Sequence, residues 1–506
     1  MELDGSNTTV PLGGNYSIRA PGLTGSAERL PGRNLTAGQR TRSRANEETA
    51  LDDALRAQGM TDQATIELTD LKTVARPGAA VLRSPMGDDA LELQTPAPAP
   101  DHDAVVLAVD ESGAVSWNFP LTNANAIQPA TSRGPGQTLR FRIPRTPAVT
   151  PPPGTIGQRG LIGTVGKKLL KVLVYPITDI VVGAGVDHFA GRWEEKHRPY
   201  RLRTVTRDNY TSANVASIAT SDSEQWKSLS SGRALFFIHG TFSTIHGGFG
   251  GLAPDDITTL SNRYGGRVFG FDHFTLSHSP ARNVDQLVSM IPADAKLDVD
   301  IVCHSRGGLV ARELVERAQR AGLAGDRFRV GTVVFVGAAN AGTVLTNPDH
   351  MVHMIDRFTS ALNIFPDNFV TDALEIIITA VKVVGHGGLK SLDGLAAMNP
   401  GGDYLKELAA QSAGKATYRG ITTDFEPNGT PFSKLALANG AVDRIFGDKK
   451  NDLVVPTAGV FEAAGPCFPI SSADVLELPS AKGVIHTTYF RDNGVRSRLR
   501  DWLTGA

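Results

Sequence analysis

The chain has 506 residues, 41% of them hydrophobic and 20% charged, and its 51 Lys and Arg against 52 Asp and Glu leave a formal net charge of −1. This length predicts two or three domains, and the even charge balance excludes nucleic acid as an expected partner, because phosphate binding needs a clustered positive excess. The two cysteines, Cys303 and Cys467, exclude a disulfide-rich scaffold and fit a reducing compartment.

Residues 1–45 are rich in Gly, Pro, Ser, Thr, Asn and Arg without apolar periodicity, which predicts a disordered tail that can be removed without loss of folding. Met1–Ala20 lacks the apolar stretch of a secretory signal, which favours a cytoplasmic protein. Residues 46–146 predict a small β-rich domain, since short alternating segments are separated by Pro, Gly and Asp. The expected strands are Ala64–Leu68, Ala90–Leu93, Ala104–Val109, Ala114–Phe119 and Thr138–Ile143.

Residues 147–230 predict a Pro-rich linker followed by a helical connection. Within them, Ile156–Arg203 fits one or two helices, basic at first and then apolar. Such a segment could make a peripheral contact with a membrane, although an apolar helical face more often packs against a neighbouring domain. Charged residues interrupt Leu161–Ala190, so it falls short of the roughly 20 apolar residues that span a bilayer.

Residues 231–506 alternate near-continuous apolar runs with amphipathic stretches, which is typical of an α/β fold whose parallel sheet is covered by helices on both faces. Proline at a first helical position and apolar residues at helical spacing indicate the helices. The expected strands are Ala234–Ile238, Arg267–Phe271, Asp298–Cys303, Val330–Gly337, Thr417–Ile421 and Asp474–Leu478, and the expected helices are Pro280–Met290, Arg306–Ala321 and Val495–Leu503.

A serine stands where one of these strands runs into a helix, in the stretch Val299-Asp-Ile-Val-Cys-His-Ser-Arg-Gly-Gly. A sharp turn there projects the Ser305 hydroxyl out of the sheet, toward the free N–H groups of the helix. Gly307 and Gly308 leave space where the turn packs closest. Cys303 replaces the first glycine of the usual G-x-S-x-G, a position that takes only small residues. Alone, this pattern is equally typical of a helix cap.

Further motifs follow in a fixed order. His239-Gly240-Thr-Phe ends a buried strand, Asn451-Asp-Leu-Val-Val-Pro carries a carboxylate before a short apolar run, and Gly483-Val-Ile-His precedes the last helix. With Val336-Gly-Ala-Ala-Asn-Ala-Gly-Thr and Leu395-Ala-Ala-Met-Asn-Pro-Gly-Gly, they make residues 233–503 resemble the bacterial serine lipases and esterases of the α/β-hydrolase superfamily.

The resemblance implies an α/β-hydrolase fold with Ser305 as nucleophile, Asp452 as acid and His486 as base, in the chain order of that fold. It also implies that the backbone N–H groups of Thr241 and Arg306 form the oxyanion hole. Asp448, four residues before Asp452, is the alternative acid, and Asp443 is a more distant one.

The expected function is hydrolysis of carboxylic esters, on an ester or lipid-like substrate, through an acyl-enzyme on Ser305. An acyltransferase or a phospholipase on the same triad, or a non-catalytic binding or scaffold protein that keeps the fold, are the alternatives. No cofactor is expected. His350 and His353 form H-x-x-H beside Asp349, but a solvated polar face is the commoner use of such residues, and no metal is expected.

An insertion at about residues 343–400 carries the apolar segments Leu362–Phe369 and Ala373–Val384 between nucleophile and acid. Apolar helices over a hydrolase mouth suit an acyl chain, so the insertion is expected to be a lid or acyl-binding cap. A plain packing pair of helices is the alternative.

Overall fold

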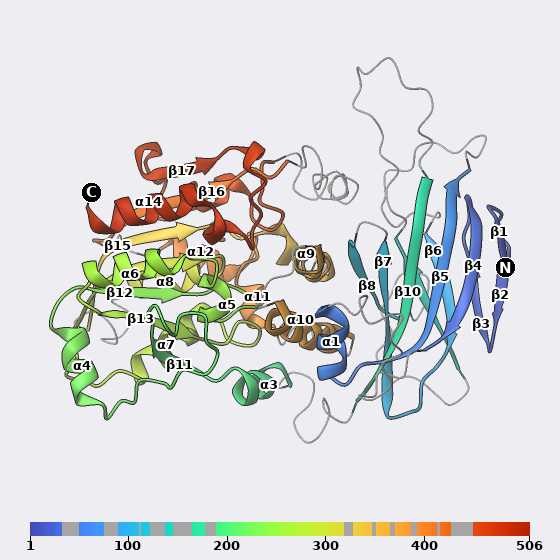
Figure 1. Cartoon of the computed structure of the whole chain (residues 1–506), viewed down its shortest axis with the longest axis horizontal. Coiled ribbons are helices and arrows are strands. Elements are labelled where there is room, and N and C mark those ends of the chain that lie inside the picture. Colours follow the sequence, from blue (N-terminus) through green and yellow to red (C-terminus); the bar gives the residue numbers. More distant parts are fainter. Residues whose placement is uncertain are drawn as a thin grey trace, which may run out of the picture. The chain divides into compact units, whose positions relative to one another are not determined.

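The structure of the chain is a computed structural model. It describes residues 1–32, 50–74, 90–110, 113–121, 137–144, 164–177, 189–317, 327–346, 351–364, 370–385, 392–411, 415–426 and 449–505. The chain forms two compact units (Figure 1). Unit 1 holds the described residues up to Phe189 together with those from Ile355 to Gly385, and unit 2 holds the others.

Unit 1 is a β-sandwich of two antiparallel sheets, with strand orders β1-β4-β5-β10-β7-β8 and β2-β3-β6-β9. All five strands expected between residues 46 and 146 are present. The strands are β1 (Glu2–Asp4), β2 (Thr9–Gly13), β3 (Tyr16–Arg19), β4 (Leu23–Pro31), β5 (Thr61–Thr73), β6 (Leu91–Pro96), β7 (His102–Asp110), β8 (Val115–Asn118), β9 (Thr138–Ile143) and β10 (Thr164–Pro176).

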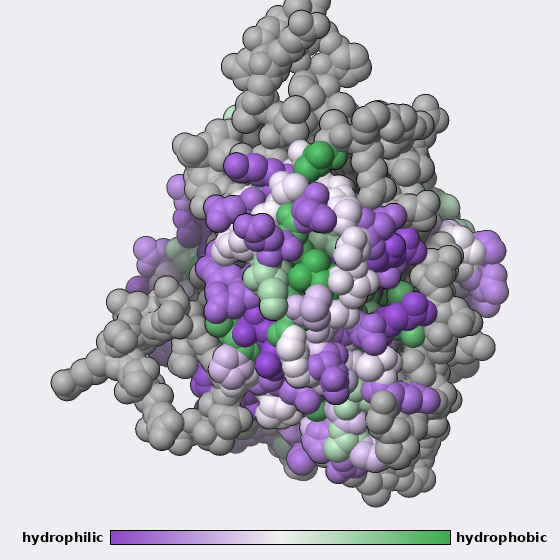
Figure 2. Space-filling model, turned by 90° about the vertical axis from the view of Figure 1, so that its right-hand side faces the viewer, coloured by the Kyte–Doolittle hydropathy of each residue, from purple (hydrophilic) through white to green (hydrophobic). Residues whose placement is uncertain are grey.

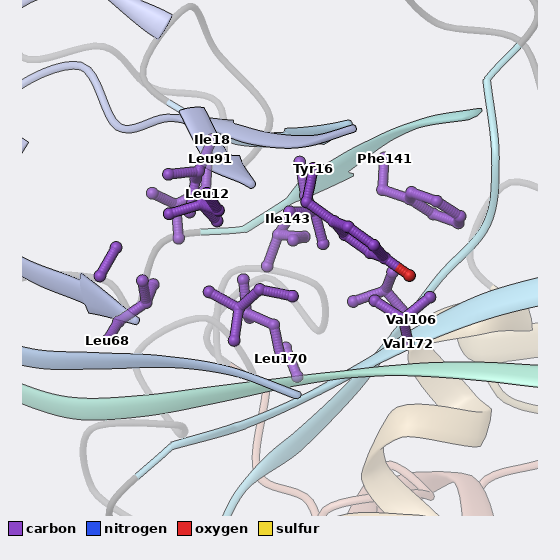
Figure 3. Packing of buried hydrophobic residues seen from close by; sticks show 14 of the residues in the cluster. Leu12, Tyr16, Ile18, Leu68, Leu91, Val106, Phe141, Ile143, Leu170 and Val172 are labelled. Carbon is purple, nitrogen blue, oxygen red and sulfur yellow. The ribbon is translucent and has the colours of Figure 1, made fainter. Parts of the chain in front are cut away.

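The core of unit 1 lies between the two sheets. Figure 3 shows Ile18, Phe141 and Ile143 of the four-stranded sheet near Leu170 and Val172 of β10, and all belong to one cluster of buried residues. Figure 2 looks at the end of unit 1 that carries β1 and β2, where most coloured residues are hydrophilic and apolar ones are scattered among them.

The expectation of a disordered tail is wrong for residues 2–31, which form β1 to β4. These strands bury alternate apolar side chains, including Leu12, Tyr16 and Ile18, and leave polar residues on the solvent side. Gly13, Gly14 and Asn15 all have positive φ, of 81°, 59° and 65°, which is the backbone of a tight hairpin turn. Their composition therefore serves a turn and is not that of a disordered segment. Residues 33–45 lie outside the described residues.

The expectation of one or two helices within Ile156–Arg203 is wrong for Thr164–Pro176, which is strand β10, between β5 and β7 in the centre of its sheet, and for residues 201–203, which begin strand β11. It is confirmed for Phe189–His197, which is helix α3. The even-numbered residues of β10 from Leu170 to Val174 lie in the sandwich core. Lys171 faces the other way and pairs with Asp52 of helix α1 (Ala50–Ala57). The β-rich unit thus extends beyond the expected 46–146 boundaries at both ends.

Two helices encoded far along the chain also belong to unit 1: α9 (Met351–Ile364), from Ile355 onward, and α10 (Val370–Gly385). β8 is an edge strand, and α9 caps its exposed backbone, because the N–H of Val115 donates to Ser360 Oγ (2.9 Å) and that of Trp117 to Asp356 Oδ1 (2.7 Å). Covering an edge in this way prevents pairing with another chain.

Helix α10 packs against α1 and against strand β7. Lys382 of α10 donates to the carbonyl of Gln58, just past α1, and its ammonium lies over the ring of Tyr175 on β10. The sequence predicts these helices as a lid or acyl-binding cap of the catalytic domain. In the structure, α9 contacts β8, and α10 contacts α1 and β7, all within unit 1. Residues 347–350, 365–369 and 386–391 lie outside the described residues.

Deleting residues 1–32 is expected to abolish the cooperative unfolding transition of unit 1, because four strands and seven of the 22 buried residues of the described sandwich core disappear. Differential scanning calorimetry checks this. The matched control is Thr9→Ala, an exposed residue of β2, which should change the free energy of unfolding by less than about 0.5 kcal/mol. A truncated protein that keeps the wild-type transition would restore the tail interpretation.

Unit 2 is built on a seven-stranded sheet of order β11-β13-β12-β14-β15-β16-β17. Only β11 is antiparallel to its neighbour; the other pairs are parallel. All six strands expected after residue 231 are present, which confirms the α/β class. The strands are β11 (Arg201–Thr204), β12 (Ala234–Ile238), β13 (Val268–Asp272), β14 (Leu297–His304), β15 (Phe328–Val336), β16 (Thr417–Thr423) and β17 (Val475–Leu478).

Helices cover both faces of this sheet (Figure 1). Apolar residues of α5, α6 and α14 share one buried cluster with one face, whereas α8 packs on the other face beside α7 and α12. The helices are α3 (Phe189–His197), α4 (Ser223–Ser230), α5 (Ile245–Phe249), α6 (Pro254–Arg263), α7 (Pro280–Ser289), α8 (Gly307–Glu316), α11 (Asp393–Ala396), α12 (Asp403–Ala409) and α14 (Asn493–Thr504).

No helix among the residues described above combines the length and the hydrophobicity needed to cross a membrane.

Candidate active site

Ser305 lies at the corner between β14, which ends at His304, and α8, which begins at Gly307. Its φ of 54° is in the left-handed region, a strained backbone for a residue with a side chain that persists only where the surroundings impose it. The glycines that follow permit the turn: a Cβ on Gly307 would lie 2.5 Å from the Ile238 carbonyl, and one on Gly308 would lie 2.6 Å from Ala338 Cβ. The corner expected from the sequence is therefore present, with Cys303 buried beneath it.

The structure brings Ser305, His486 and Asp452 into one hydrogen-bonded chain. His486 Nε2 lies 2.9 Å from Ser305 Oγ, and His486 Nδ1 lies 2.8 Å from Asp452 Oδ2. A carboxylate can only accept, so Nδ1 carries the proton, and Nε2 is free to accept from the serine hydroxyl. All three residues are almost fully buried: the exposed fraction is 2% for Ser305 and 1% for both His486 and Asp452.

Asp452 is held from four directions. Its Oδ1 accepts from the N–H groups of Val454 (3.0 Å) and Val455 (2.8 Å), and its Oδ2 accepts from His486 and from the Tyr489 hydroxyl (2.9 Å). Burial alone would raise the pKa of Asp452, but His486 and the two amides outweigh it and lower the pKa below its usual value. The Asp452 carboxyl group is therefore ionised in the folded protein at neutral pH.

The loop that carries His486 is fixed through its own backbone. The His486 N–H donates to the Asp452 carbonyl (3.0 Å), and the His486 carbonyl accepts from His304 Nε2 (2.9 Å). Burial, with the nearby charge of His486, lowers the pKa of His304 to about 3. His304 is thus a neutral donor, and it ties the histidine loop to the end of the nucleophile strand.

The loop after β12 approaches the nucleophile closely. A Cβ on Gly240 would lie 2.5 Å from Ser305 Cβ, so only glycine fits there. Among the residues that the structure describes, the backbone N–H groups of Thr241 and Arg306 donate no hydrogen bond to the protein. Arg306 directly follows Ser305 in the chain, and Thr241 directly follows Gly240, the residue that lies against Ser305. Donors to a developing oxyanion must lie beside the attacking serine in this way.

His239 fixes the backbone of this loop through both of its ring nitrogens. Its Nδ1 lies 2.9 Å from the Gly240 carbonyl, and its Nε2 accepts from the N–H of His273 (3.1 Å). Burial lowers the pKa of His239 to about 4, so the ring stays neutral and its two nitrogens keep distinct donor and acceptor roles.

The Arg306 side chain has a structural task that the sequence did not suggest. Fully buried, it donates to the carbonyl of Gly394 (2.7 Å), to Asn283 Oδ1 (2.9 Å) and to the carbonyl of His278. Burial lowers its pKa to about 10, which leaves it charged at neutral pH. Glu194 of α3 holds the same loop after β13, because its carboxylate accepts the N–H groups of Thr275, Leu276 and Ser277 (2.5, 2.9 and 3.0 Å).

The alternative acids Asp448 and Asp443, and His350 of the H-x-x-H motif, lie outside the described residues. His353 lies in α9. Within the described ranges, no group of three or more His, Cys, Asp or Glu side chains is placed to hold a metal ion. Asp272, beside the oxyanion loop, accepts from Arg201 (2.7 Å) and from the N–H of Ile245 (2.7 Å), so its oxygens already have partners.

Tyr489, His304 and Glu194 are the site residues that sequence reasoning missed. Tyr489 stands three residues after the expected base, but nothing in that spacing shows that its hydroxyl meets Asp452. The geometry as a whole can support nucleophilic attack on an acyl carbon: a serine hydroxyl, a base in contact with it, an ionised acid that orients the base, and free N–H groups beside the nucleophile.

A family described as "Domain of unknown function (DUF7379)" has a model that matches residues 197–504. No curated protein matches the chain. Among solved structures, a lipase of Bacillus licheniformis, BlEst2 in mature form, is 14% identical with a TM-score of 0.33 and covers 54% of this chain and 91% of its own. Lipase 1 from Pelosinus fermentans is 14% identical with a TM-score of 0.33, covering 53% and 98%.

Phospholipase PlaB from Legionella pneumophila is 14% identical to this chain, with a TM-score of 0.29 and a coverage of 45% of each chain. Similarities at this level of sequence identity and TM-score do not indicate a function for this chain.

Proposed function

This chain belongs to the DUF7379 family, and we propose that it is a serine hydrolase of the α/β-hydrolase type that cleaves carboxylic esters through an acyl-enzyme on Ser305. The observation that carries the proposal is the continuous chain of hydrogen bonds from Ser305 Oγ through His486 to Asp452, at 2.9 and 2.8 Å. A strained serine at a strand-to-helix corner, with a base already in contact, has a cost that a purely structural role does not explain.

In the first half-reaction, His486 Nε2 takes the proton of Ser305 as Oγ attacks the acyl carbon of the ester. The carbonyl oxygen becomes an oxyanion, which the N–H groups of Thr241 and Arg306 stabilise by about 3 kcal/mol each. When the C–O bond breaks, His486 gives its proton to the leaving alcohol. Asp452 stays ionised throughout, and it stabilises the imidazolium and holds its tautomer.

In the second half-reaction, His486 takes a proton from a water molecule as the water attacks the acyl carbon. The bond from this carbon to Ser305 Oγ then breaks, His486 gives the proton to Oγ, and the acid product leaves. An alcohol that replaced this water would make the chain an acyltransferase, so adding an alcohol to the assay and measuring the ester formed separates the two outcomes. Because Ser305 is 2% exposed, either acceptor and the substrate require local opening of the residues around it.

Covalent labelling with a fluorophosphonate probe tests the proposal, because only an activated serine reacts fast with it. We expect stoichiometric labelling of the wild-type chain, complete loss of the label in Ser305→Ala, and retention in Ser289→Ala, an exposed serine of α7. Wild-type protein should also hydrolyse p-nitrophenyl esters. A folded wild-type chain that takes no label would show that the fold serves binding without turnover.

A further inference from the structure

Tyr489 meets the acid of the triad directly. It lies in the short 3-10 turn Tyr489–Arg491, just past the histidine loop, and is completely buried. Its hydroxyl donates to Asp452 Oδ2 at 2.9 Å, and this is the same oxygen that accepts from His486 Nδ1 at 2.8 Å. The phenol and the imidazole therefore share one carboxylate oxygen.

The surroundings are built to keep the phenol there. Gly337, directly after β15, has a φ of 51°, and a Cβ on it would lie 2.6 Å from Tyr489 Cε2 and 3.1 Å from Asp452 Oδ2. A side chain at this position would force the ring and the carboxylate apart. Burial and the charge of Asp452 raise the pKa of Tyr489 well above its usual value, so the hydroxyl keeps its proton and remains a donor.

We propose that Tyr489 is a positioning residue of this site, whose phenol holds the Asp452 oxygen that faces His486 and so sets the pH range in which Ser305 is activated. This inference rests on the proposed function. Tyr489 touches neither the nucleophile nor a substrate atom in this scheme and acts only through the carboxylate.

The direction of the effect follows from the shared oxygen. A hydrogen bond from Tyr489 withdraws negative charge from Oδ2, which leaves less charge to stabilise the His486 imidazolium. Without the hydroxyl, Oδ2 carries more negative charge and stabilises the imidazolium more strongly. We therefore expect the acid limb of the activity profile to move to higher pH.

Few other titratable groups can interfere with this effect. His304, at the end of β14, packs against His486 with ring centroids 4.8 Å apart, and His239, after β12, interacts electrostatically with His304. Burial lowers the pKa of His304 to about 3 and that of His239 to about 4. Both rings are therefore neutral at neutral pH, so we attribute a moved acid limb in a Tyr489 variant to Asp452 and Tyr489.

The test is the pH dependence of the rate at which a fluorophosphonate inactivates the full-length protein, because it reports the base of the free enzyme without knowledge of the substrate. In Tyr489→Phe, which keeps the ring and removes only the hydroxyl, we expect the acid limb to move up by about half to one pH unit. The maximal rate should fall by about threefold to tenfold, since Asp452 loses one of four hydrogen bonds.

The matched control is Tyr418→Phe, which removes a buried hydroxyl that donates to Glu316 Oε1 at 2.9 Å, at the end of α8 opposite Ser305. It should lower the melting temperature to a similar degree and leave the acid limb unmoved. In an Asp452→Asn background, Tyr489→Phe should have no further effect on the rate. Two results would overturn the inference. One is an acid limb that does not move in Tyr489→Phe. The other is a Tyr489→Phe change that lowers the rate as much in Asp452→Asn as it does in the wild type.

If Tyr489→Phe does not fold, 3-fluorotyrosine placed at position 489 keeps the hydroxyl and makes it a stronger donor. The acid limb should then move down, opposite to the change in Tyr489→Phe. A limb that stays at the wild-type position also contradicts the inference. Wild-type protein that takes no label at any pH would refute the proposed function itself, and so the two failures are distinguishable.

Discussion

His486→Ala is expected to lower kcat/KM for a p-nitrophenyl ester by about 10⁵-fold to 10⁶-fold. The imidazole at 2.9 Å from Ser305 Oγ is the only base in contact with that hydroxyl among the described residues, and without it the serine must lose its proton to water. The remaining rate comes from the oxyanion donors and from substrate binding. Initial rates at pH 8, with circular dichroism to verify folding, measure the loss.

Non-additivity is the control for this prediction. Nucleophile and base act as one unit, so Ser305→Ala combined with His486→Ala should be no slower than either single variant. The fold should tolerate the change, because the bond from His304 goes to the backbone carbonyl of residue 486, which alanine keeps. A folded His486→Ala protein with more than about one hundredth of the wild-type rate would show that another group is the base.

Asp452→Asn is expected to lower kcat by about 10⁴-fold, because an amide nitrogen facing His486 Nδ1 favours the wrong tautomer of the ring. The geometry around the side chain should survive, since Val454 and Val455 can still donate to the amide oxygen. Kinetics of p-nitrophenyl ester hydrolysis, with KM measured separately, check the prediction.

The parallel variant Asp448→Asn decides between the two acids that the sequence offered. If Asp452 orients His486, Asp448→Asn should stay within about twofold of the wild-type rate, because this variant keeps the Asp452 carboxylate and its bond to His486 Nδ1. The opposite pattern, with Asp448→Asn inactive and Asp452→Asn active, would transfer the role to Asp448.

The strands of unit 2 were predictable because most are buried on both faces. β12 is apolar along its whole length, and β14 is apolar apart from Asp298, Asp300 and His304. Such runs between amphipathic helices are typical of a parallel sheet. β11 escaped prediction because two of its four residues are arginines. Arg203 is fully buried, but it donates to the carbonyls of Asn209 and Ser212, and this compensation is visible only in three dimensions.

Unit 1 was harder to predict because its strands carry mixed signals. β10 contains Lys167, Lys168 and Lys171, which favour a solvated helix face over a central strand. In the structure, the buried Lys168 ammonium donates to the Pro144 carbonyl, and Lys171 pairs with a helix. Helices α9 and α10 contribute to this unit from a distant part of the chain, and a linear reading assigns them to the domain that encloses them.

For the site, the order of the motifs was enough to name the residues that meet, because each motif ends a predicted strand or precedes a predicted helix. The sharp turn at Ser305 could be predicted from the strand-to-helix junction, with Gly307 and Gly308 where the turn packs closest. Tyr489 could not be found in the same way. Its contact with Asp452 depends on one turn of 3-10 helix and on the space left by Gly337, neither of which has a sequence pattern of its own.

The insertion of α9 and α10 into unit 1 has a consequence for biosynthesis. A ribosome releases the chain from its N-terminus, and domains generally fold as they emerge. The β-sandwich here cannot finish in that order, because the residues that cap the edge of β8 and cover α1 follow the nucleophile strand in the message. A nascent polypeptide therefore carries an incomplete unit 1 while the sheet of unit 2 is still being translated, and we expect chaperones to protect it during that interval.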